Sequence, residues 1–93
     1  MIVGVLDIEL YIPNSNSLKA KRFAIKSLKD RLKYRFNIAV AETDHTDKWQ
    51  RSTLGVAAVS NDAKHVGNIL DNVMKHIYSD YRVEVIRSTR VFY

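Results

Sequence analysis

The fold is decided by residues 2–12, IVGVLDIELYI, and by the change of period that follows them. The even-numbered positions of this segment are apolar or glycine, and the odd-numbered positions carry valines, Asp7, Glu9 and Tyr11. Alternation with a period of two predicts a long β-strand with one buried face and one half-exposed face. Residues 13–17, PNSNS, form a polar turn whose last residues can cap a helix.

After this turn the period lengthens to that of a helix. Apolar residues recur at intervals of seven, three, four and four, namely at Leu18, Ile25, Leu28, Leu32 and Phe36. Such a stripe predicts an amphipathic helix of about 18 residues. Residues 38–43 then return to β character, and a polar stretch occupies residues 44–48.

The second half of the chain repeats this order. An alternating segment extends from about Trp49 to Ser60, and residues 60–62 offer a helix cap. The following apolar stripe predicts a second helix, with Val66, Ile69, Leu70, Val73 and Ile77 on its buried side. We expect the last strand from Tyr81 to about Ile86, followed by a tail that ends in Val91-Phe92-Tyr93.

Two successive β-α-β units in one short chain favour a single compact solution. Because crossovers between parallel strands are right-handed, the predicted fold is α+β, a ferredoxin-like βαββαβ sandwich. Its four-stranded antiparallel sheet carries both helices on one face. Each half is too small to hold a core, so residues 1–93 are expected to form one domain.

Composition excludes several classes of protein. The 93 residues contain no cysteine, which excludes a disulfide scaffold and a thiolate metal site. No apolar run approaches the roughly 18 residues of a membrane span, and the first residues lack the basic head of a signal peptide. We therefore expect a cytoplasmic protein with no membrane partner.

The net charge of +5 is concentrated in the first helix. Residues 17–35 contain eight basic residues and one acid, Asp30, a net charge of +7, and the rest of the chain has seven basic and nine acidic residues, a net charge of −2. At about 100° per residue, five of the cations fall in a band roughly 80° wide beside the apolar stripe. We call Lys19, Arg22, Lys26, Lys29 and Lys33 the basic stripe.

Cations at the start of this helix oppose the helix dipole, and like charges at these spacings repel one another. One interpretation is an anion surface, on which the basic stripe, Lys21 and the helix start at residues 16–17 bind the phosphates of RNA. Phe23 and Tyr34 lie on the side opposite the core, where they suit base stacking or a protein contact. The alternatives are a helix face that serves solubility alone, or one that binds an acidic protein.

The open face of the sheet favours a different partner. An RNA-recognition motif would place stacking aromatics there, but the corresponding run is Leu54-Gly55-Val56-Ala57-Ala58-Val59. Asp7 and Glu9 would also repel phosphate on this face. A patch of small apolar residues suits a second copy of the chain, so we expect a homodimer through the sheet face.

No catalytic signature is present, and we expect neither an enzyme nor a cofactor. Asp44, His45 and Asp47 could donate metal ligands, but their spacing matches no metal motif, and a hairpin loop held by Asp side chains is the simpler interpretation. We expect Trp49 to pack this loop, and Gln50 and Arg51 to pair with the loop's Asp residues.

Several segments together resemble the YlxP-like proteins, small bacterial proteins classed as a domain of unknown function. The resemblance covers nearly the whole chain and includes SLKAKR at residues 17–22, KSLKDRL at 26–32, RFNIAVAE at 35–42, DKWQR at 47–51 and LGVAAVSN at 54–61. It implies the same ferredoxin-like fold, and it carries no catalytic residues or cofactor. Genes of the family tend to lie among those for translation factors and ribosome maturation, which favours RNA or a ribosome surface as the acidic partner.

Overall fold

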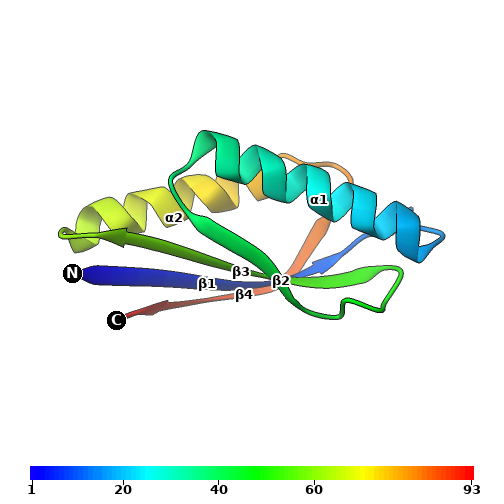
Figure 1. Ribbon diagram of the computed structural model, residues 1–93, viewed down its shortest axis with the longest axis horizontal. Helices are drawn as coiled ribbons and strands as arrows, with labels where there is room; N and C mark the ends of the chain where they lie inside the picture. Colours follow the sequence, from blue (N-terminus) through cyan, green and yellow to red (C-terminus); the bar gives the residue numbers. More distant parts are fainter.

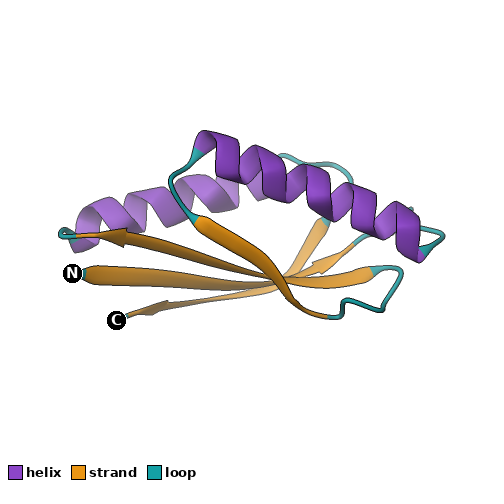
Figure 2. Cartoon of the chain, viewed as in Figure 1, coloured by secondary structure: helices purple, strands orange, loops and turns teal.

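The computed structural model describes all residues, 1–93, and its elements follow the expected order. They are β1 (Ile2–Tyr11), α1 (Leu18–Arg35), β2 (Ala39–Asp44), β3 (Arg51–Ser60), α2 (Ala63–Tyr78) and β4 (Glu84–Phe92) (Figure 1). The strands form one sheet in the order β2-β3-β1-β4, with every neighbouring pair antiparallel. Both helices lie on one face of the sheet and leave the other face open (Figure 2). The ferredoxin-like prediction is confirmed.

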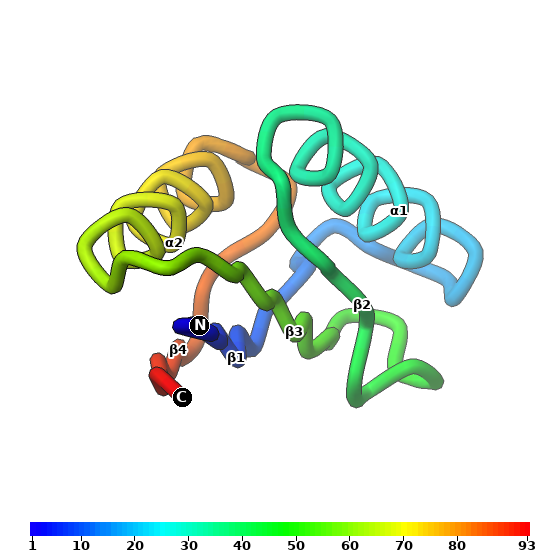
Figure 3. Tube along the Cα trace, turned by 60° about the vertical axis from the view of Figure 1, so that its left-hand side comes forward, coloured from blue at the N-terminus to red at the C-terminus, as the bar shows by residue number.

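The alternation of β1 places its even-numbered side chains between the sheet and the helices. Leu6, Ile8 and Leu10 are buried, and the odd-numbered residues beside them face the open side. α2 packs on β1 and β3, whereas α1 packs on β2, so the two helices share one layer (Figure 3). Their buried contribution to the core is Ile25, Leu28 and Leu32 from α1 and Val66, Leu70, Val73 and Ile77 from α2.

The last strand differs from the prediction, because it begins at Glu84 and continues to Phe92. Glu9 pairs with Arg87, whereas Leu10 pairs with Val85, which leaves Ile86 as an extra residue in a β-bulge. The extra residue shifts the side chains that follow it to the opposite faces of the sheet. The period-two pattern is therefore interrupted at Ile86, and the polar segment after it does not predict a strand. The strand continues because β1 supplies its backbone partners, and Arg90 pairs with Asp71 of α2.

Gly4 marks the closest approach of α2 to the sheet. A Cβ at this position would collide with the side chain of Val66 and would lie 2.9 Å from Cδ1 of Leu70. Gly67, on α2, is the contrasting case, because a Cβ there would meet only the ring of Phe92 at 3.9 Å. Alanine at Gly4 therefore tests the packing of α2 on the sheet, whereas alanine at Gly67 tests only the loss of glycine's backbone freedom.

We expect Gly4→Ala to lower the free energy of unfolding by about 1–3 kcal/mol, because the methyl group overpacks the core. Gly67→Ala should raise the free energy of unfolding by about 0.5–1 kcal/mol, since alanine favours the helix and meets no obstacle. Urea denaturation followed by circular dichroism measures both. Equal effects of the two substitutions would contradict the packing of α2 on β1.

Candidate nucleic-acid interface

The sequence around α1 explains where the helix begins and how it is held. Ser17 caps the helix by accepting a hydrogen bond from the backbone N–H of Ala20 at 3.0 Å. The buried Ser15 hydroxyl donates to the carbonyl of Ser17 at 3.0 Å. The Gln50 side chain donates to the carbonyls of Pro13 and Ser15, both at 3.1 Å, and so ties the turn before α1 to the start of β3.

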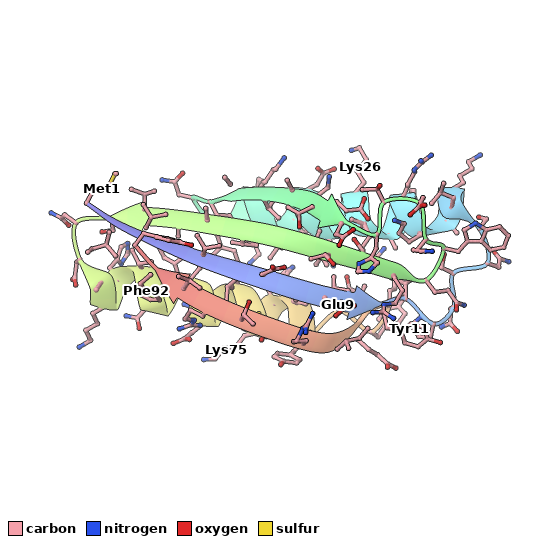
Figure 4. All side chains as sticks on the ribbon, turned by 90° about the horizontal axis from the view of Figure 1, so that it is seen from below. Met1, Glu9, Tyr11, Lys26, Lys75 and Phe92 are labelled. Atoms are coloured by element: carbon pink, nitrogen blue, oxygen red, sulfur yellow. The ribbon has the colours of Figure 1, made fainter.

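The basic stripe follows the side of α1 that borders β2. Arg22, Lys26, Lys29 and Lys33 line a groove of about 470 Å³ together with Ile25, Asp30 and Glu42. Lys19 continues the stripe toward the helix start and is exposed. Lys26 projects at this edge of the molecule in the view of the open face (Figure 4). The structure thus places the five predicted cations along one side of one helix.

Lys21 does not belong to this surface. Its side chain is completely buried, and its amino group donates to Oε2 of Glu42 at 2.7 Å and to the carbonyls of His45 at 3.0 Å and Thr46 at 3.2 Å. All three protons are used, so Lys21 has no donor left for a phosphate. The prediction that placed Lys21 among the phosphate contacts therefore needs correction.

The helix period predicts that Lys21 lies on the buried side of α1. Lys21 precedes Ala24 and Ile25 by three and four residues and Leu28 by seven, so it lies on the buried side of α1. Lys21 also lies within the interval of seven residues between Leu18 and Ile25, where the apolar stripe has no member. The prediction grouped Lys21 with its exposed neighbours only because its side chain is basic.

The two acids of the groove are already paired. Glu42 accepts from Lys21 and also from the hydroxyl of Ser52 at 2.7 Å. Asp30 pairs with Lys26 at 2.7 Å, and the hydrogen bond from Lys26 holds the pKa of the Asp30 carboxyl below its ordinary value. Lys19, Arg22, Lys29 and Lys33 form no ion pair. The groove therefore offers positive charge with no free acid beside it.

Aromatic side chains accompany the basic stripe. Phe23 is 74% exposed and Tyr34 is 93% exposed, as the helix period predicted. Trp49 is 57% exposed and lines a separate hollow with the turn before α1, instead of packing the loop. The expected pairing of Gln50 and Arg51 with the loop's Asp residues is wrong, because Gln50 binds that turn and Arg51 pairs with Glu9.

The open face of the sheet is divided into a polar end and an apolar end. Its polar end is a hollow of about 450 Å³ lined by Asp7, Glu9, Thr43, Asp44, His45, Thr53, Arg87 and Thr89. The hydrogen bond from Arg51 holds the pKa of the Glu9 carboxyl below its ordinary value. The acids of this end make the open face a poor surface for phosphate, in contrast to α1.

Of the loop residues considered as metal ligands, Asp44 and His45 already form hydrogen bonds within the protein. His45 has a φ of 59°, its Nδ1 lies 2.9 Å from the hydroxyl oxygen of Thr53, and its backbone N–H donates to Asp44 at 2.7 Å. No group of three His, Asp or Glu side chains is placed to hold a metal ion. The structure does not bring Asp44, His45 and Asp47 together as ligands.

The apolar end of the open face carries small side chains. Cross-strand pairs place Val3 beside Val59, and Val5 beside both Ala57 and Val91. Val59 is 56% exposed and Val91 is 46% exposed. In the view of this face, Met1 and Phe92 mark the end that carries the patch, and Glu9 and Tyr11 mark the polar end (Figure 4).

The fold and the site define a small ferredoxin-like domain with one cation-rich helix. The chain belongs to the family described as protein of unknown function (DUF503), whose model matches residues 3–90. It is 32% identical over 83 residues to the uncharacterized protein YlxP of Bacillus subtilis (strain 168), a match that covers 89% of this chain and 90% of that protein. The resemblance to the YlxP-like proteins is thereby confirmed.

A designed protein has the same fold. The de novo designed protein Foldit4 superposes with a TM-score of 0.58 at 14% sequence identity, over 98% of this chain and 97% of that one. This similarity concerns the fold alone. No helix of the structure is long and apolar enough to cross a membrane.

Lys21→Met is expected to lower the free energy of unfolding by about 3–5 kcal/mol, because it leaves the Glu42 carboxylate without its cation and the carbonyls of His45 and Thr46 without their donor. Lys26→Met, which removes an exposed pair, should cost about 0.5 kcal/mol or less. Adding Glu42→Met to Lys21→Met should recover much of the loss, since both charges are then removed together. Urea denaturation measures all three variants. No recovery in the double variant would contradict the assigned role of the pair.

Proposed function

We propose that the protein is a non-enzymatic domain that binds RNA, or an RNA surface of the ribosome, through the outer side of α1. One observation carries the proposal: four of the five cations of the basic stripe, Lys19, Arg22, Lys29 and Lys33, form no ion pair, whereas both acids of the adjoining groove are already paired. A surface that served only solubility would gain from interleaved acids, which relieve repulsion along a helix. Free cations in a row instead suit a polyanion.

The dimensions of the stripe support a strand of nucleic acid. Lys19 and Lys33 are 14 residues apart, which corresponds to about 21 Å along a helix axis. Duplex phosphates recur about every 3.4 Å along one strand, so a span of this length passes several of them. The exposed rings of Phe23 and Tyr34 lie on the same helix and can stack on unpaired bases. Single-stranded RNA therefore fits this surface better than a duplex.

For a contact with about four phosphates, the logarithm of the affinity should fall with the logarithm of the salt concentration at a slope near −3. Fluorescence anisotropy with a labelled single-stranded RNA of 20 nucleotides, between 50 and 200 mM KCl, measures this slope. Arg22→Glu combined with Lys33→Glu should weaken binding at least tenfold and flatten the slope, because two contacts become repulsive.

The matched control combines Lys48→Glu with Lys64→Glu, which changes the net charge equally at exposed positions outside the stripe. This control should retain most of the affinity and the slope. Equal losses in both double variants would show that only the total charge matters, and binding without salt dependence would contradict the proposal.

A second candidate function is a homodimeric adaptor or regulator that uses the open sheet face and has no role with nucleic acid. The observation that favours it is the uncovered apolar end of this face, where Val59 and Val91 are half exposed. Small flat side chains allow two sheets to approach closely, and a patch of this kind suits a two-fold contact between identical surfaces.

In this case light scattering after size exclusion should give twice the mass of the 10.7 kDa chain. Ala57→Arg should convert the dimer to a monomer, because a cation would be buried at the centre of the contact. Thr89→Arg, on the polar end of the same face, is the control and should leave the dimer intact. A monomer in the unmodified protein would eliminate this candidate.

A further inference from the structure

An exposed tryptophan lies at the end of the molecule where α1 begins. Trp49 belongs to the loop between β2 and β3, and it is 57% exposed. It lines a hollow of about 570 Å³ together with residues 13–16 of the turn before α1. Figure 1 shows this loop and this turn at the same end of the molecule. The volume lies within the range of about 300–1,000 Å³ that is typical of small-molecule sites.

The Trp49 ring is exposed although the backbone on both sides of it is held by hydrogen bonds. After the tryptophan, the carbonyl of Gln50 accepts from the N–H of Ile12 at 2.9 Å. Before it, the N–H of Lys48 donates to the carbonyl of His45 at 3.2 Å. The fold therefore determines the position of the ring. A large aromatic side chain that is already in place is suited to binding, because little conformational entropy is lost when a partner covers it.

The rest of the hollow is polar. Asn14 and Asn16 are exposed there, and a side-chain amide can both donate and accept hydrogen bonds. No acidic side chain lines the hollow, and Trp49 and Pro13 are its only apolar members. A protein partner would instead require a well-packed apolar pocket around the aromatic anchor. One flat aromatic face beside hydrogen-bonding groups suits a nucleobase.

The hollow continues the surface that carries the basic stripe. The amino group of Lys21 binds the carbonyls of residues 45 and 46, which holds the loop of Trp49 against the first turns of α1. Lys19, the first cation of the stripe, lies only three residues after Asn16 of the hollow. A strand whose phosphates follow the stripe therefore reaches the hollow at the start of the helix.

We propose that the hollow binds one base of a single-stranded RNA whose phosphates lie on the basic stripe, with the base stacked on the indole ring of Trp49. The amides of Asn14 and Asn16 bind the edge of this base or its ribose hydroxyl. The inference rests on the proposed RNA binding and adds a fixed position for one nucleotide beside the start of α1. Stacking does not depend on charge, so Lys48 at the hollow is not required for it.

Trp49 is the only tryptophan of the chain, so its fluorescence reports directly on the hollow. The probe is a single-stranded oligoadenylate of 20 nucleotides, compared with an abasic strand of the same length that keeps the ribose phosphates. We expect oligoadenylate to quench the fluorescence saturably, because a stacked base contacts the indole. The abasic strand should bind more weakly, with the same salt slope near −3, and should leave the fluorescence unchanged.

Trp49→Ala should weaken the binding of oligoadenylate about tenfold, which is the effect of losing one stacked base, and should leave the salt slope unchanged. Trp49→Phe should restore most of the affinity, since it restores an aromatic face. The control is Tyr78→Ala, which removes an exposed ring at the end of α2 and should bind normally. Arg22→Glu combined with Lys33→Glu should flatten the salt slope, which the Trp49 variants do not. Fluorescence anisotropy measures each affinity.

Three results would overturn the inference: binding of oligoadenylate with unchanged Trp49 fluorescence, equal affinities of Trp49→Ala and the unmodified protein, or equal losses in Trp49→Ala and Tyr78→Ala. Each leaves the proposed RNA surface intact as long as the salt-dependent binding persists, and each would favour a protein as the partner of the hollow. If neither strand binds, the proposed function itself fails, and this inference fails with it. Thermal unfolding of each variant establishes that it is folded.

Discussion

The orientation of α1 depends on one buried ion pair, between Lys21 and Glu42. The pair joins the first turns of the helix to β2, and the other two protons of Lys21 hold the carbonyls of His45 and Thr46 in the following loop. One amino group thus connects a helix, an edge strand and a hairpin loop. A buried charge with all its protons used tolerates little rotation of the helix, because any displacement leaves it unpaired.

This constraint determines which side of α1 meets solvent beside β2. With Lys21 directed inward, Arg22, Lys26 and Lys29 follow the helix period along the groove that borders the strand. The same contact removes the free charge of Glu42 from that groove. A structural interaction therefore produces the electrostatic property on which the proposed function depends, since a free carboxylate among the lysines would weaken the attraction for phosphate.

The alternation of residues 2–12 and the two apolar stripes were sufficient to predict the fold, because period and order leave one compact topology. The exposed cations of the stripe followed from the same helix period. Lys21 was misplaced because residue type was given more weight than position, although its spacing to Ala24 and Leu28 indicated burial. The extent of β4 was not predictable, because a bulge at Ile86 is created by pairing with β1 and leaves no local signal.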